Sequence, residues 1–216
     1  MKKQLFLATT ILISGLMHSQ DSLSHKNEKA KVFGVSPSKK TKNVNGVLLK
    51  YYDEIDNEIK PKKVNGLGLG FNGLGVFFPV LLLVNIGSID SWEINNRDLE
   101  SLPKKMNTIN GMQLSIINME PTVTNGFELS FSSNISAPSV INGVSVSPLY
   151  NFHHTTNGVT VSTFANISKK CRGLQVALIN VCNEDSKGLQ IGFWNENEKR
   201  KLPLINWNFK KKKEKS

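Results

Sequence analysis

The octapeptide Gly173-Leu-Gln-Val-Ala-Leu-Ile-Asn180 is followed, fifteen residues later, by Gly188-Leu-Gln-Ile-Gly-Phe-Trp-Asn195, and both belong to a longer series. Six such phrases begin at Gly111, Gly126, Gly143, Gly158, Gly173 and Gly188, at intervals of 15, 17, 15, 15 and 15 residues. A regular internal period predicts a repeat protein, because equivalent units bury equivalent faces. The repeat therefore constrains the architecture before any local propensity is considered.

Each phrase alternates apolar and polar residues after its glycine. The first, third and fifth positions are apolar in sixteen of eighteen cases, and Pro148 and Thr163 are the exceptions. The second position is always polar and the fourth always small. The second positions are Gln113, Glu128, Ser145, Thr160, Gln175 and Gln190. This period of two predicts an all-β protein whose strands have one apolar face and one small, polar face. It argues against helices, in which residues two apart point to opposite sides.

Ten short strands are predicted from this pattern, with one more suggested around Val32–Val35. The ten cover residues 46–52, 65–72, 73–85, 111–118, 126–133, 143–150, 158–165, 173–180, 188–195 and 202–209. Asn precedes glycine at Asn45, Asn65, Asn110, Asn125, Asn142 and Asn157. Because Asn-Gly tolerates positive φ at both residues, these pairs predict tight turns. A second Asn closes most phrases and is interpreted as turn chemistry as well.

Three arrangements could close these strands. A β-solenoid explains the uniform spacing, but the segments between phrases, such as His153-His-Thr-Thr, are too polar for a second apolar wall. A soluble barrel with an apolar interior would have an outer surface on which Glu128 is the only charge among eighteen residues, whereas water-facing sheets normally carry many Lys and Glu. The favoured interpretation is an antiparallel meander closed as an outer-membrane β-barrel, with its apolar face toward lipid. The solenoid is kept as the alternative.

The ends of the chain suggest export. Residues 1–19 place Lys2 and Lys3 before an apolar run at 5–17, which is typical of a secretory signal peptide. Residues 20–44 are a polar lead-in, 45–209 the β-repeat domain and 210–216 a basic tail. The 216-residue chain has a net charge of +10, but its lysine clusters lie in turns and ends without interleaved aromatic residues. This favours solvated loops or contact with anionic lipid headgroups over binding of nucleic acid, and outer-membrane lipid is the predicted partner.

The phrases at 173–180 and 188–195 resemble the G-L-Q-I-G-L-x-N units of an exported bacterial surface-repeat family, which consists of uncharacterised β-repeat proteins of the cell envelope. The ending at 201–209 is similar to the terminus of that family. The similarity is strong over residues 158–209 and looser back to Gly111. It implies export to the outer membrane or cell surface, with the periplasm as the alternative, and it transfers no activity and no functional residue.

No catalytic, cofactor-binding or metal-binding residue is predicted. His153-His154 is assigned to a solvated turn, and a hydrolase using either histidine is disfavoured because no activated nucleophile accompanies them. The acidic run at 53–58 lacks the glycine-centred spacing of a calcium loop. The candidate partner-binding loop is the segment at 86–110, which interrupts the repeat and contains Trp92, Arg97 and a short helix capped by Ser91. A poorly ordered insertion is the alternative interpretation of this segment. Its partner, protein or glycan, is unknown.

Cys171 and Cys182 are the only cysteines of the chain. At opposite ends of a straight strand over 173–180, their Cα atoms would lie roughly 36 Å apart, whereas a disulfide requires about 4.4–6.8 Å. Two free thiols are therefore predicted. For the whole chain, we predict a non-enzymatic cell-envelope protein with a structural or surface-interaction role, and a soluble exported binding module is the alternative.

Overall fold

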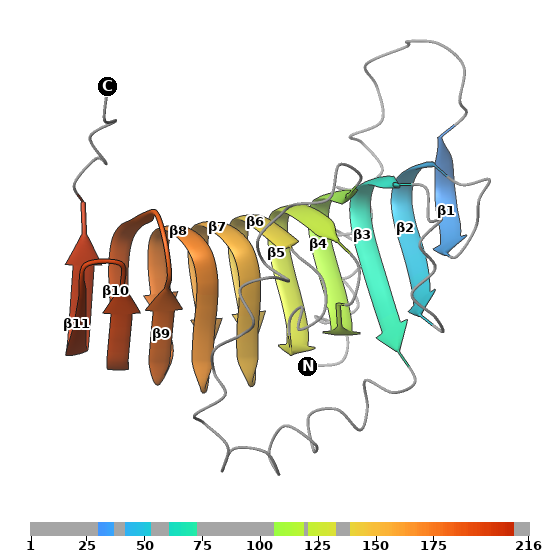
Figure 1. Cartoon of the computed structure of the whole chain (residues 1–216). Coiled ribbons are helices and arrows are strands. Elements are labelled where there is room, and N and C mark those ends of the chain that lie inside the picture. The colour runs from blue at the N-terminus through green and yellow to red at the C-terminus, as the bar shows by residue number, and fades with distance from the viewer. Residues whose placement is uncertain are drawn as a thin grey trace, which may run out of the picture.

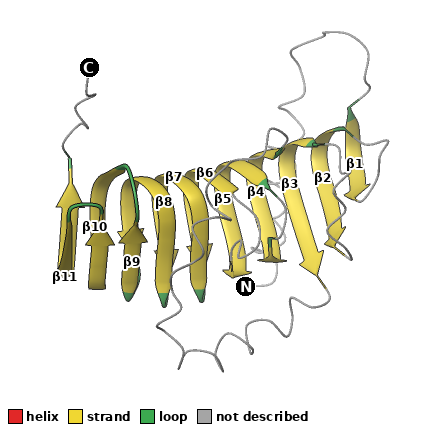
Figure 2. Ribbon diagram, viewed as in Figure 1, coloured by secondary structure: helices red, strands yellow, loops and turns green. Residues whose placement is uncertain are grey.

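The computed structural model describes residues 30–36, 42–52, 61–72, 106–118, 121–132 and 139–209, and these ranges contain strands and turns but no helix (Figure 1, Figure 2). The strands are β1 (Lys31–Ser36), β2 (Asn43–Tyr52), β3 (Lys63–Asn72), β4 (Asn107–Ile117), β5 (Thr122–Ser132), β6 (Ser139–Ser147), β7 (Tyr150–Ser162), β8 (Ala165–Val176), β9 (Ile179–Cys182), β10 (Ser186–Asn197) and β11 (Arg200–Asn208). Figure 1 shows them in one row from β1 to β11. The predicted strand at 73–85 and the helix after Ser91 lie outside the described residues.

The strands stack as successive coils of a parallel β-solenoid. Each described pairing is parallel except that of β10 with β11. The register follows the sequence repeat, since Gly143 pairs with Gly158, Gly158 with Gly173, and Gly173 with Gly188. The all-β fold and its repeat of about 15 residues are confirmed. The antiparallel barrel is wrong, and the solenoid alternative describes the fold.

Each coil bends at the glycine that opens its phrase. Eight glycines, Gly46, Gly66, Gly111, Gly126, Gly143, Gly158, Gly173 and Gly188, have φ values between 128° and 147°. Residues with a Cβ rarely adopt this region. A Cβ at Gly158 would also collide with the carbonyl oxygen of Gly143 in the preceding coil. The predicted tight turns at Asn-Gly are wrong, because β6 and β7 continue through these pairs and only bend there.

A coil consists of two walls. The front wall contains the residues that follow each glycine, such as 158–162, 173–176 and 188–191. The back wall contains 150–153, 165–168, 179–182 and 194–197, after the corners at 148–149, 163–164, 177–178 and 192–193. In the last coils, β8 pairs with β10 on the front wall and β9 pairs with β10 on the back wall. The walls enclose a narrow interior.

This interior is largely polar. From the back wall, Asn151, Asn166, Asn180 and Asn195 are fully buried and form a ladder, in which each amide nitrogen donates to the next carboxamide oxygen at 2.8–2.9 Å. The same amides also bond the front wall, as Asn166 Nδ2 does to the Val176 carbonyl at 2.9 Å. Because hydrogen-bonded polar groups can be buried at little cost, polar segments form the second wall. The expectation that a solenoid requires an apolar second wall was therefore wrong.

Cys171 and Cys182 form a disulfide, with their Cα atoms 6.1 Å apart. The prediction of free thiols is wrong because residues 173–180 do not form one straight strand. β8 ends at Val176, the chain turns at Ala177 and Leu178, and β9 returns along the back wall. Both cysteine side chains are buried, so the bridge links neighbouring coils from the inside.

β11 ends the described solenoid by retracing the last coil in reverse. Leu202 pairs with Asn195 on the back wall, and Trp207 pairs with Leu189 on the front wall. The corner of β11 lies at Leu204, whose φ is 63°, opposite Gly192. Asn206, Asn208 and Gln190 are buried at this end, so the polar interior continues to the last strand.

Candidate functional site

Several sequence-predicted features lie outside the described residues. These are the candidate partner-binding residues Trp92 and Arg97, the acidic run at 53–58, the signal peptide at 1–19 and the basic tail. Within the described residues, no helix is long and apolar enough to cross a bilayer. The same residues contain no group of three or more His, Cys, Asp and Glu side chains arranged to hold a metal ion. The candidate sites that the structure describes therefore all lie on or inside the solenoid.

His153 lies inside the solenoid, so its prediction as part of a solvated turn is wrong. Its Nδ1 is 2.8 Å from Ser139 Oγ and its Nε2 is 3.2 Å from Ser145 Oγ, and all three residues are buried. Burial lowers the pKa of His153 to about 3, which keeps the ring neutral at physiological pH. A nucleophile and its base must be reached by a substrate. Both serines are buried together with the histidine, so a substrate does not reach them. Their contacts instead fix the packing of β6 against β7.

His154 is also buried, in contrast to the prediction. Its Nδ1 is 2.8 Å from Thr155 Oγ1. Burial lowers the pKa of His154, and the positive charges of Lys169 and Lys170 act in the same direction, while Glu184 opposes them. The imidazole is therefore held in its neutral form between β7 and the lysines of β8.

Glu128 and Lys50 are two ionisable residues of the interior. Glu128 is fully buried, and its Oε2 accepts a hydrogen bond from Thr124 Oγ1 at 3.4 Å. Burial raises the pKa of Glu128 to about 7, against the opposing effects of the Thr124 hydrogen bond and the charge of Lys50. Since solvent does not reach this carboxyl group, its titration affects the stability of the coils and not a substrate.

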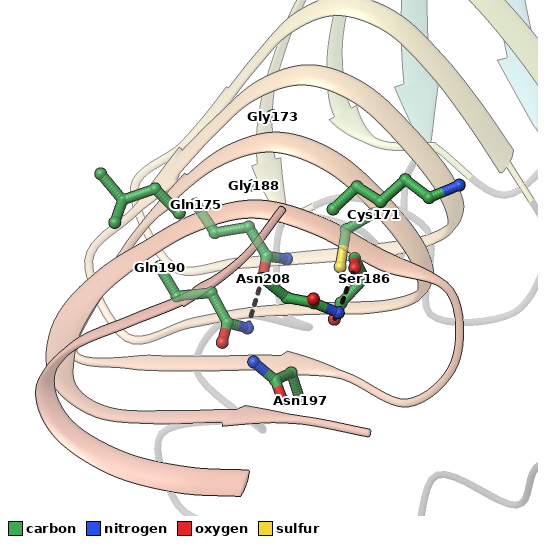
Figure 3. Close-up of a pocket in the computed structure, with 10 residues that line it drawn as sticks. Cys171, Gly173, Gln175, Ser186, Gly188, Gln190, Asn197 and Asn208 are labelled. Atoms are coloured by element: carbon green, nitrogen blue, oxygen red, sulfur yellow. Dashed lines mark hydrogen bonds between the residues drawn. The ribbon is translucent and has the colours of Figure 1, made fainter. Parts of the chain in front are cut away.

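A small cavity lies in the last coils, inside β8, β10 and β11 (Figure 3). Gln190 Nε2 donates to Gln175 Oε1 at 2.8 Å, and Asn208 Nδ2 donates to the Ser186 carbonyl at 2.7 Å. The amide nitrogen of Gln175 and the carbonyl oxygen of Gln190 have no hydrogen-bond partner in the described part of the chain. The volume is about 10 Å³, which is roughly the space of one water molecule. The cavity is too small for an organic ligand.

The outer face of the front wall is a candidate binding surface. It is formed by the first, third and fifth residues after each glycine. These include Leu67, Leu69, Phe71, Met112, Leu114, Ile116, Phe127, Leu129, Phe131, Val144, Val146, Val159, Val161, Leu174, Val176, Leu178, Leu189, Ile191 and Phe193. Met112, Leu129 and Phe131 are 39–42% exposed. An extended apolar patch on a protein surface typically marks an interaction site. The sequence predicted this outward apolar face, although on a barrel.

Exposure of this face increases at its C-terminal end. Because Ile191 pairs with Ile205 and Leu189 with Trp207, β11 extends the apolar rows by one strand. We define the aromatic end as Phe193, Leu204, Ile205, Trp207 and Phe209, whose exposed fractions range from 47% to 74%. The Arg200 guanidinium lies 4.4 Å from the centre of the Trp207 ring. Sequence analysis did not single out this cluster as a site, although four aromatic residues among the last 24 of the chain could have indicated it.

Comparisons with known proteins add no functional assignment. A scan against protein-family models found no match, and neither the curated proteins nor the solved structures gave one. The similarity to an exported surface-repeat family therefore stays a prediction from the sequence.

Proposed function

We propose that this protein is an exported, non-enzymatic binding module of the cell envelope, which rests the outer face of its front wall against a lipid surface. The observation that carries the proposal is the reversal of polarity across the front wall. Gln190 points into the interior and is 5% exposed, whereas the next residue, Ile191, points outward and is 39% exposed. Because the polar side chains of the front wall are buried in the interior, its apolar side chains remain on the outer surface, where a partner can contact them.

The dimensions of the face fit a broad, flat contact. The front wall from β3 to β8 and β10 contains seven strands, which at a spacing of about 4.8 Å extend over about 29 Å. Five residues along each strand cover about 16 Å. The outward side chains named above carry no charge. Such a face can lie in the plane of a membrane, where apolar side chains enter the boundary between headgroups and acyl chains.

Charge and cysteine chemistry also support the proposal. Arg172 and Lys187 continue the row of Asn157 at the margin of the face. Asp185 pairs with them at 2.9 and 3.3 Å, which lowers the pKa of its carboxyl group. The whole chain carries a net charge of +10, which attracts it to anionic headgroups. The Cys171–Cys182 disulfide supports export, since disulfides persist mainly in oxidising compartments.

Co-sedimentation with lipid vesicles tests the proposal. The double variant Met112→Ser/Leu129→Ser removes two exposed apolar side chains from the middle of the face, and binding should fall roughly tenfold because less apolar area leaves water. The control, Asn183→Ser, changes an exposed polar residue away from this face and should bind as the wild type does. Equal binding by the double variant, or no binding of the wild type to any vesicle, would refute the proposal.

A further inference from the structure

We infer that the aromatic end is the part of the molecule that enters the membrane, and that its ligand is a bilayer containing anionic lipid. The inference rests on the proposed function and adds a contact point and a lipid class to it. It follows from the exposure of the aromatic end, its shape and the charges beside it.

The aromatic end exposes more apolar surface than the central coils of the front wall do. Phe193 is 74% exposed, Leu204 68% and Phe209 72%, whereas Val144 and Val159 in the central coils are only partly exposed. The difference arises because β11 is the last described strand, so its side chains have a neighbouring coil on one side only. Trp207 belongs to the aromatic end, whereas Trp194 projects from the outer side of the back wall. Tryptophan is enriched at the level of lipid headgroups, because its ring is apolar and its N–H is polar.

Basic residues accompany the aromatic end. Lys199 lies in the turn between β10 and β11, Arg200 and Lys201 begin β11, and all three are exposed. Two carboxylates face the same region: Glu196 pairs with Lys201 at 3.0 Å, and Glu198 accepts hydrogen bonds from the Ser186 and Asn208 nitrogens at 2.7 and 3.1 Å. Directly after Phe209 the sequence continues with five lysines and one glutamate at 210–215, a net charge of 5 − 1 = +4. Anionic headgroups attract such a cluster.

A bilayer fits this end better than a second copy of the chain does. The surface is not a flat sheet, because the register of β10 and β11 shifts between Gly192 and Trp194 and the chain turns at Leu204. Two sheets that pack face to face require flat, complementary apolar surfaces, and protein interfaces contain few lysines at their centre. Fluid lipid accommodates projecting side chains such as Phe193, and its headgroups complement the lysines.

Tryptophan fluorescence tests the inference in the full chain. Trp92→Phe/Trp194→Phe leaves Trp207 as the only tryptophan, so emission reports on the aromatic end alone. On vesicles of phosphatidylcholine with one-third phosphatidylglycerol, emission should shift to shorter wavelength and be quenched by brominated lipid. Without phosphatidylglycerol, or without residues 210–216, affinity should fall about tenfold or more, since each lysine near an anionic surface contributes appreciably.

Two variants in this background separate the inference from the proposed function. Phe193→Ser/Leu204→Asn, in which Asn tolerates the positive φ of residue 204, should abolish the emission shift. Met112→Ser/Leu129→Ser should weaken binding but keep the shift. If vesicle binding depends on Met112 and Leu129 but tryptophan emission does not shift on binding, this inference is overturned and the proposed function still stands. If the protein binds soluble heparin as tightly as it binds vesicles, the inference is overturned in favour of a polyanion. If the protein sediments as a dimer that only Phe193→Ser/Leu204→Asn dissociates, the inference is overturned in favour of a second copy of the chain.

Discussion

The interior and the outer face of the front wall lie on opposite sides of the same backbone, yet they follow opposite rules. Inside, Gln175 and Gln190 are stacked in register and joined by a hydrogen bond of 2.8 Å. Outside, Val176 and Ile191 are stacked in the same register and present only carbon to their surroundings. A parallel, in-register stack places like residues about 4.8 Å apart, a spacing that lets amide side chains bond along the axis. This bonding lets the polar side of the strands be the buried one.

The comparison depends first on the glycine bends, which keep both faces in register, and their loss should have the largest effect. Gly158→Ala places a Cβ against the carbonyl oxygen of Gly143 at a φ of 137°. We expect the free energy of unfolding to fall by about 3 kcal/mol or more, because the strained conformation and the collision both oppose folding. Urea denaturation measures the loss.

Gly68→Ala is the matched control for this prediction. Its added Cβ would meet chiefly the Gln113 Oε1 atom, the end of a flexible side chain, and its φ lies outside the left-handed region. The cost should be clearly smaller than at Gly158. Equal losses at the two positions would show that crowding of the interior, and not the bend, limits stability.

The disulfide tests whether two coils are joined through the interior. Cys171→Ser/Cys182→Ser opens a loop of eleven residues, and loop-closure entropy predicts a loss of about 3 kcal/mol. Thermal denaturation should show the same loss when the wild type is reduced, and reduction should leave the double variant unchanged. Mass spectrometry of the alkylated, non-reduced protein should find no labelled cysteine. Two labelled cysteines would restore the straight strand that the sequence predicted.

The strands, their period and the outward apolar face could be predicted, because all three depend only on alternation within one phrase. The direction of pairing could not, since phrases at a constant interval fit a meander of hairpins as well as a stack of coils. The deciding contacts join different coils, such as Asn166 to Asn180 at 2.9 Å and Cys171 to Cys182. The aromatic end escaped detection for a related reason: its exposure results from the absence of a described coil beyond β11, and not from its own residue pattern.

Interior electrostatics should make stability depend on pH. The pKa of Glu128 is about 7 in the folded protein, against an ordinary value of 4.5 that applies to the unfolded chain, so between these values the unfolded chain releases a proton that the folded chain retains. Stability from this group is present below about pH 4.5, decreases as pH rises and levels off above about pH 7. Glu128→Gln mimics the protonated form and should be more stable than the wild type at pH 8, by about 3 kcal/mol, but similar to it at pH 4.5. Urea denaturation at both pH values checks this, and a pH-independent difference would mean that the carboxyl group does not titrate in this range.

The finest comparison uses two adjacent residues, Thr160 inside and Val161 outside. Thr160 is 1% exposed, and its Oγ1 has no hydrogen-bond partner in the described part of the chain. Thr160→Val replaces that hydroxyl by a methyl of similar size and should stabilise the protein by about 1 kcal/mol, because an unsatisfied buried polar group is removed. Val161→Thr adds a hydroxyl on the outer face, where it should change stability by less than about 0.5 kcal/mol. Urea denaturation of each variant measures the two changes in the free energy of unfolding. A destabilised Thr160→Val would mean that the hydroxyl is bonded inside the coil, and that the polar interior is satisfied at this position as completely as it is along the asparagine ladder.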